Sequence, residues 1–145
     1  MSGAEEGGAE FDRRLVVNFD GGARGNPGPA AVAAVVSSPA GEVLEQRAEA
    51  IGVATNNVAE YRALLLAIER ARALGAREVD LIGDSELIVR QVRGEYKVKD
   101  AGLRPLHAAA REALAGLERW SIRNVPRAEN DAADALVNAA LDAPG

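Results

Sequence analysis

The sequence predicts a single α/β domain in which helices pack on a mixed β-sheet. The chain has 145 residues, enough to bury about two-thirds of its surface around one core. Its apolar share of 48% and its charged share of 27% are typical of a globular domain. Hydrophobic periodicity predicts the element order βββαβααβα, and this order indicates a sheet covered by helices.

Three strands are predicted first, over residues 15–20, 31–38 and 43–51. The first is apolar and the second is rich in small residues. The turn signal SPAGE over residues 38–42 separates the second strand from the third. Because short turns join consecutive strands, we expect these three to form an antiparallel meander.

The remaining elements are mostly helices. Residues 58–74 are predicted to form a helix, because Tyr61, Leu64 and Ile68 recur at helical spacing and Gly75 stands at the C′ position. Further strands are expected over 79–83 and 120–125, and further helices over 85–92, 105–117 and 130–141. The side chains expected to face inward from the 105–117 helix are Leu106, Ala109, Ala110, Ala113, Leu114 and Leu117.

The composition limits the kind of metal site that the chain can build. It has no cysteine, and His107 is its single histidine. His107 lies in a predicted amphipathic helix, so we interpret it as a surface or packing residue. A metal site must therefore use oxygen ligands, which suit Mg²⁺, Mn²⁺ or Ca²⁺.

The N-terminus and the apolar segments indicate a cytoplasmic protein without a membrane partner. No apolar run approaches the roughly 20 residues that span a bilayer. The start, MSGAEEGGAEFDRR, lacks the pattern of a signal peptide, and residues 1–13 are interpreted as a mobile acidic tail. The net charge of −5 argues mildly against nucleic-acid binding, but the segment RQVRGEYKVK over residues 90–99 is locally basic.

Two carboxylates close predicted strands. Asp20 ends the strand VVNFD and precedes the glycine-rich segment GGARGNPG, and Asp84 follows the strand VDLIG. Each has a purely structural alternative, because Asp before Gly is common in turns and Asp is common at helix starts. The glycine-rich segment is a tight hairpin and not a P-loop, since no Gly-Lys-Ser/Thr follows it.

Two further carboxylates lie near helix starts. Glu60 is three residues after Asn57, the spacing of a capping box, but it also borders the apolar stripe of its helix. Asp131 and Asp134 stand in the first turn of the last helix, where the helix dipole favours acids. Asp134 shares a face with Val137, so we expect it to point towards the sheet and Asp131 towards solvent.

These carboxylates are predicted to meet. Strand ends and helix N-termini converge on one rim of an open α/β sheet, where ligands bind. Carboxylates gathered there repel one another unless a cation neutralises them. Two divalent ions about 4 Å apart form an arrangement that hydrolyses phosphodiesters. The predicted cluster consists of Asp20, Glu60, Asp84 and Asp134.

Four blocks in this order and spacing resemble type 1 ribonuclease H: FDGGARGNPGPA, ATNNVAEYRALLLAI, GDSELIVRQ and VPRAENDAADAL. The resemblance covers residues 15 to about 141. It implies the ribonuclease H-like fold, a five-stranded mixed sheet with its second strand antiparallel to the rest and helices on both faces. The implied catalytic domain is residues 14–142, and the implied state is a monomer.

The resemblance also implies an activity and its site. The implied activity is Mg²⁺-dependent hydrolysis of the RNA strand of RNA–DNA hybrids, with two ions, Mn²⁺ as a possible substitute, and 5′-phosphate and 3′-hydroxyl products. The implied catalytic and metal-binding residues are Asp20, Glu60, Asp84 and Asp134. The hairpin glycines would let backbone amides approach the substrate. Substrate contacts are expected from Gly21, Gly22, Asn26, Thr55, Asn56, Asn57, Ser85, Lys97, Lys99 and Arg127; helix capping is an equal alternative for Ser85.

Three features depart from the family pattern. The loop NVPRAEN before the last helix holds no histidine, and Arg127 is its one cation. The long basic insertion of some members is reduced to GEYKVKDAG, which leaves Lys97 and Lys99 for a smaller basic contact. Glu86 stands where some relatives have glutamine, so it is left out of the site.

Two other functions stay open at this stage. A non-catalytic module could use the same fold to bind hybrid or double-stranded RNA, although four acids on one rim disfavour it. A related nuclease could act with relaxed substrate choice, for instance on double-stranded RNA or branched DNA.

Overall fold

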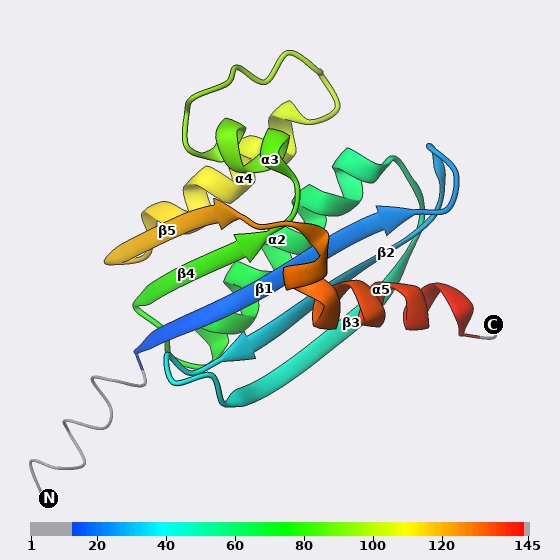
Figure 1. Cartoon of the computed structure of the whole chain (residues 1–145). Coiled ribbons are helices and arrows are strands. Elements are labelled where there is room, and N and C mark those ends of the chain that lie inside the picture. The colour runs from blue at the N-terminus through cyan, green and yellow to red at the C-terminus, as the bar shows by residue number, and fades with distance from the viewer. Residues whose placement is uncertain (1–12, 144–145) are drawn as a thin grey trace, which may run out of the picture.

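The computed structural model describes residues 13–143 and contains the predicted five-stranded mixed sheet (Figure 1). Of the expected acidic tail, residues 1–12 lie outside the described residues. The strands are β1 (Arg14–Ala23), β2 (Gly28–Ser37), β3 (Val43–Ala54), β4 (Glu78–Gly83) and β5 (Arg119–Asn124). The helices are α2 (Asn56–Ala73), α3 (Glu86–Val92), α4 (Arg104–Ala115), α5 (Asp131–Asp142) and a short 3₁₀ turn, η1 (Arg127–Asn130), which was not predicted.

The sheet order is β3-β2-β1-β4-β5. Strand β2 runs antiparallel to β1 and β3, whereas β4 runs parallel to both β1 and β5. The second strand is therefore antiparallel to the others, as expected. The parallel strands β1, β4 and β5 end on the same side of the sheet, which brings their carboxyl ends together.

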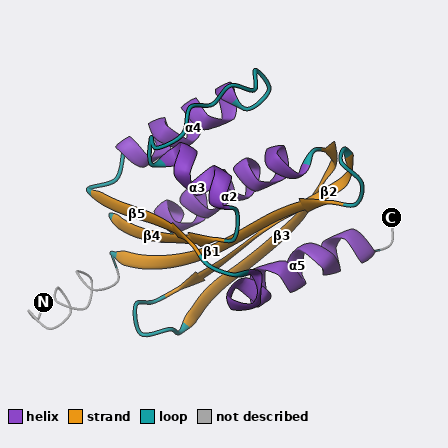
Figure 2. Ribbon diagram, turned by 45° about the horizontal axis from the view of Figure 1, so that its top comes forward, coloured by secondary structure: helices purple, strands orange, loops and turns teal. Residues whose placement is uncertain are grey.

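Helices cover both faces of the sheet (Figure 2). On one face, α2, α3 and α4 enclose the main core, whose largest fully buried side chains include Phe19, Tyr61 and Leu81. On the other face, α5 packs through Val137 on Ala31 and Ala33 of β2. The small residues of β2 let α5 approach the sheet closely, which accounts for the composition of this strand.

Two details of the predicted elements are wrong. Strand β1 does not end at Asp20 but continues to Ala23, because residues 21–23 pair with residues 30–32 of β2. Ala109 of α4 is exposed, while Ala110 and Leu114 are buried. The helix therefore packs along a narrower stripe than its alanine-rich sequence suggested. No helix among residues 13–143 is long and apolar enough to cross a membrane.

A buried polar group joins α2, α3 and α4. The Tyr61 hydroxyl donates to Gln91 Oε1 at 2.7 Å, and both side chains are buried. His107 Nε2 lies 3.0 Å from the Gln91 carbonyl oxygen, and its ring stands edge-on to Tyr61 at 6.3 Å between centroids. The structure thus gives His107 a packing role between helices, as the sequence indicated.

Replacing Tyr61 by phenylalanine is expected to lower the free energy of unfolding by about 1–3 kcal/mol. The substitution keeps the ring but leaves Gln91 Oε1 buried without its donor, and an unsatisfied buried acceptor costs about this much. Urea unfolding followed by circular dichroism measures the change. Tyr96→Phe is the control, since Tyr96 is 46% exposed. Equal stability of the two variants would contradict the assigned role of the Tyr61–Gln91 bond.

Candidate metal centre

Three carboxylates from separate elements meet at one end of the sheet. Asp20 extends from β1, Glu60 from the first turns of α2, and Asp84 from the residue that follows β4. One oxygen from each lies within 4.8 Å of the others. Asp20 is 5% exposed and Glu60 is 6% exposed, so the group is set into the protein and does not lie on its surface.

Gly21 lets Glu60 reach this position. A Cβ atom on Gly21 would overlap the carbonyl oxygen of Ala59, so only glycine allows the first turns of α2 to lie against β1. The Gly21 amide then donates to Glu60 Oε1 at 2.7 Å. The capping-box alternative for Glu60 is wrong, because Thr55 caps α2 and accepts from the Val58 amide at 3.2 Å.

Asp84 supplies an unpaired oxygen. Within residues 13–143, its Oδ2 is the one buried side-chain nitrogen or oxygen that has no hydrogen-bond partner. A buried acceptor without a donor is costly, and it is expected where a cation is to bind. Its neighbour Ser85 caps α3 by accepting from the Ile88 amide at 3.3 Å, so the capping interpretation of Ser85 is confirmed.

The fourth acid comes from α5. Asp134 is partly buried and lines the same cavity as the other three, whereas Asp131 is exposed, as predicted. Asn130 fixes the start of this helix on β1. Its side-chain amide donates to the Phe19 carbonyl at 2.9 Å, and its oxygen accepts from Asn18 at 3.0 Å. Nothing in the sequence pattern marked Asn130, because its partners are 111 and 112 residues away.

Burial and the neighbouring negative charges disfavour the ionised forms of Asp20 and Glu60. Burial, followed by the charges of Asp84 and Asp134, raises the pKa of Asp20 from 3.8 to about 7, although Arg127 opposes this rise. Burial and then the charge of Asp20 raise the pKa of Glu60 well above its usual range. The hydrogen bond from the Gly21 amide only partly offsets that effect. The protein thus holds these carboxylates where their ionised forms are disfavoured unless positive charge is supplied.

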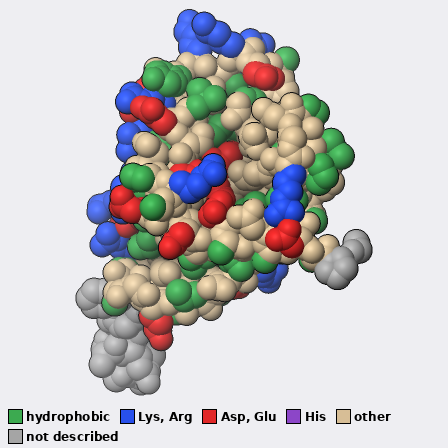
Figure 3. Space-filling view, turned by 45° about the vertical axis from the view of Figure 1, so that its right-hand side comes forward, with side chains coloured by type: hydrophobic (Ala, Val, Ile, Leu, Met, Phe, Trp, Pro, Cys, Tyr) green, Lys and Arg blue, Asp and Glu red, His purple; other side chains and the backbone are tan. Residues whose placement is uncertain are grey.

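The four acids lie in an open cavity of about 400 Å³. Figure 3 shows acidic side chains in a hollow of the surface with basic side chains beside it. Two arginines, Arg24 and Arg127, line the cavity. Arg24 is paired with Asp142 at 2.5 Å, whereas the side chain of Arg127 makes no hydrogen bond or ion pair with any described residue.

The predicted substrate contacts divide into three groups. Gly21, Gly22, Asn56, Asn57, Ser85 and Arg127 line the cavity. Asn26 and Thr55 do not line it but support its wall, since Asn26 Oδ1 accepts from the Asn56 amide at 3.0 Å. Lys97 and Lys99 line a different cavity, with Leu87, Glu95 and Tyr96. The lining residues that the sequence did not indicate are Ala23, Arg24, Val137, Asn138 and Leu141.

Two hairpin amides are not available to a ligand. The Gly21 amide donates to Glu60, and the Ala23 amide donates to Asn56 Oδ1 at 2.8 Å. The expectation that hairpin glycines present free amides is therefore wrong for Gly21. Its glycine is required by the approach of α2 instead.

Comparison with known proteins agrees with this geometry. A reverse transcriptase-like family profile matches residues 18–140. Ribonuclease HI of Halobacterium salinarum is 48% identical over 129 residues, which are 89% of this chain and 65% of that protein. A bifunctional protein of Mycobacterium tuberculosis is 45% identical over 131 residues, which are 90% of this chain and 36% of its own. The chain therefore spans less than two-thirds of the length of these relatives.

Solved structures show the same fold. The crystal structure of ribonuclease H1 from Halobacterium salinarum has a TM-score of 0.87 and covers 89% of this chain and 98% of its own. LC11 ribonuclease H1, crystallised in complex with an RNA/DNA hybrid, has a TM-score of 0.85 at 41% identity. The match covers 88% of this chain and 96% of that chain. With its element order, its sheet and its group of acids, the chain belongs to the type 1 ribonuclease H family.

Proposed function

We propose that the chain is an endoribonuclease that hydrolyses the RNA strand of RNA–DNA hybrids and leaves 5′-phosphate and 3′-hydroxyl ends. Two Mg²⁺ ions are the proposed cofactors, with Mn²⁺ as a substitute. The relative crystallised with an RNA/DNA hybrid supports this substrate. The four carboxylates of one chain form the site without a second subunit, and a monomeric enzyme is part of the proposal.

The observation that carries the proposal is the close grouping of carboxylates at the end of the sheet, two of them buried. Oxygens of Asp20, Glu60 and Asp84 lie within 4.8 Å of one another, and Asp84 Oδ2 has no partner among residues 13–143. Hard oxygen donors at this spacing fit Mg²⁺ or Mn²⁺. Asp20, Glu60, Asp84 and Asp134 would hold the ions. Bound divalent ions make a water nucleophilic and neutralise charge on the phosphate that reacts.

Other residues of the cavity suit the substrate. Arg127 is unpaired beside the acids, so its guanidinium can hold a phosphate next to the scissile one. Asn57 lines the cavity with a side-chain amide that both donates and accepts, which matches the 2′-hydroxyl of RNA. Arg127 is also the cation proposed to serve where relatives use a loop histidine. Lys97 and Lys99 lie outside the cavity and are proposed to touch the hybrid farther from the cut.

Asp84→Asn is expected to reduce cleavage of a labelled RNA–DNA hybrid in Mg²⁺ by at least about 100-fold. The substitution keeps the shape of the side chain and removes the charge that a metal needs. Replacing a group that merely orients a metal ligand costs about 10–100-fold, and a direct ligand should cost no less. Product formation is measured with Mg²⁺, with Mn²⁺ and with EDTA.

Asp131→Asn is the matched control, because Asp131 is an exposed acid in the same turn of α5 as Asp134 and lies outside the cavity. It should cleave like the wild type. A wild type that binds the hybrid but cuts it with neither metal would overturn the enzyme in favour of a binding module. Equal cleavage of double-stranded RNA and hybrid would instead point to a nuclease with relaxed substrate choice.

Asp20→Asn is expected to stabilise the metal-free protein, and increasingly so as the pH rises from 4 to 7. The folded pKa of about 7 exceeds the unfolded value of 3.8, so between these values the folded chain keeps a proton that the unfolded chain releases, and the wild type loses stability as the pH rises. The slope is at most about 1.4 kcal/mol per pH unit. Asparagine has no such loss. Thermal unfolding in EDTA across this pH range measures the difference.

Added Mg²⁺ should make the wild type more stable than Asp20→Asn at pH 7. The wild type would gain stability by binding the ion, whereas the variant would gain little. Asp131→Asn again serves as the control and should follow the wild type in both series. If Asp20→Asn is less stable than the wild type by the same margin at pH 4 and at pH 7, the raised pKa of Asp20 is contradicted.

A further inference from the structure

No helix among residues 13–143 covers one part of the sheet. Helix α5 packs on β1, β2 and β3, and Figure 1 shows that β4 and β5 are uncovered on the same side. Figure 2 shows α2, α3 and α4 on the opposite face. Strand β5 is also an edge strand of the described sheet, in which it pairs with β4 alone. The side chains that β5 presents to this uncovered side are therefore free to meet another molecule.

The alternation of β5 sorts its side chains between the two faces. Trp120 and Ile122 pack with the main core, and Arg111 of α4 lies 5.7 Å from the Trp120 ring. Arg119, Ser121 and Arg123 consequently face the uncovered side. The hydroxyl of Ser121 donates to Asp80 of β4 at 2.8 Å, which fixes this orientation.

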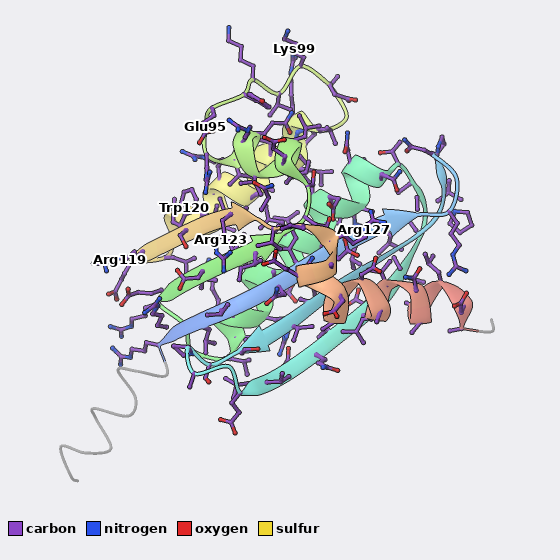
Figure 4. The ribbon with its side chains drawn as sticks, viewed as in Figure 1. Glu95, Lys99, Arg119, Trp120, Arg123 and Arg127 are labelled. Atoms are coloured by element: carbon purple, nitrogen blue, oxygen red, sulfur yellow. The ribbon has the colours of Figure 1, made fainter. Side chains whose placement is uncertain are left out.

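We call Arg119, Arg123 and Arg127 the arginine row. Figure 4 shows it extending from the start of β5, through Arg123, to Arg127 in η1. All three are exposed. Arg119 is 3.6 Å from Glu78 but its side chain remains 82% exposed. The side chain of Arg123 forms no hydrogen bond or ion pair with any residue of the described part.

Acidic neighbours do not cancel the charge of this row. Strand pairing sets Arg123 opposite Ile82, and Arg119 opposite Glu78. The carboxylate between them, Asp80, is already held by Arg14 at 2.9 Å and by Ser121. An exposed pair such as Arg119–Glu78 is worth little, so a stronger anionic partner can displace it.

The row is continuous with the acid cavity. Arg127 lines that cavity, and Asn124, the residue after Arg123, pairs with Gly83 immediately before Asp84. The Val125 amide donates to the Gly83 carbonyl at 2.9 Å, which holds the end of β5 beside the acids. Arg123 lies four residues after Arg119 on the strand, a distance of about 13 Å. One strand of a duplex carries one phosphate per about 3.4 Å of axis, so this length spans about four nucleotides.

We propose that the arginine row binds the phosphates of the nucleic-acid strand that leaves the acid cavity along β5. The row is a second, sequence-independent contact that lengthens the substrate footprint in one direction. Guanidinium groups favour phosphates because they donate bidentate hydrogen bonds to them. This inference rests on the proposed function, since it takes a nucleic acid as the ligand of the cavity.

The test measures binding apart from cleavage. Three labelled hybrids are used: a short one centred on the cavity, and two versions extended by about eight base pairs on one side or the other. Dissociation constants are measured by fluorescence anisotropy over a salt series in the Asp84→Asn background with Mg²⁺. Arg123→Ala and Arg119→Ala are compared with Arg47→Ala, an exposed arginine on β3, the opposite edge strand.

Arg123→Ala should weaken binding of one extended hybrid by about 3–10-fold and reduce its salt slope by about one. Arg119→Ala should act in the same direction. Binding of the short hybrid and of the hybrid extended on the other side should not change, and Arg47→Ala should have no effect. Thermal unfolding verifies that each variant is folded.

Equal affinities and salt slopes for Arg123→Ala and Arg47→Ala on every hybrid would overturn the proposal, and so would an equal loss on the short and extended hybrids. The first result is also the one expected if the row binds an acidic protein segment instead. Failure of the proposed function is seen separately, as an absence of cleavage by the protein with Asp84 intact. The anisotropy series would then still report whether the row binds nucleic acid.

Discussion

The repulsion between buried carboxylates at the end of the sheet is the constraint on which the rest of this structure depends. Asp20 and Glu60 are almost fully buried, and the pKa of each is raised by burial and by a neighbouring carboxylate. A fold gains nothing from such an arrangement by itself, because desolvated carboxylates destabilise the folded state when they ionise. The surrounding elements must therefore be rigid enough to hold the acids together until a cation neutralises them.

The fold supplies that rigidity through contacts between distant segments. Gly21 admits α2 against β1 and bonds to Glu60, and Asn130 ties the start of α5 to Phe19 and Asn18. The parallel order of β1, β4 and β5 brings the ends of these strands to one side. The acids are held by the backbone of the sheet and by the hydrogen bonds of Gly21 and Asn130, and no ion pair with a basic side chain of residues 13–143 fixes them.

Periodicity was enough to predict the order of the elements, because each apolar stripe reports the face that its own helix or strand buries. The four acids could also be grouped in advance, since strand ends and helix starts share a rim. Periodicity could not predict the features that depend on contacts between distant segments. These features are the exposure of Ala109, the cap formed by Thr55 and the role of Asn130. The sequence did single out Gly21, but for an amide that would approach the substrate. In the structure this amide donates to Glu60 instead.

The same electrostatics explains why cationic side chains outside the cavity matter. A group of four acids repels phosphates until ions occupy it, so the cavity alone is a poor place for a nucleic acid to dock. The chain carries a net charge of −5 and lacks the long basic insertion of some relatives. Its attraction for phosphate must then come from local arginines that are not engaged in ion pairs, and the side chains of Arg123 and Arg127 meet that condition, although Arg127 also acts electrostatically on Asp20. Net charge is therefore a poor guide to binding here, because the field near the substrate is set by the few charges that remain unpaired.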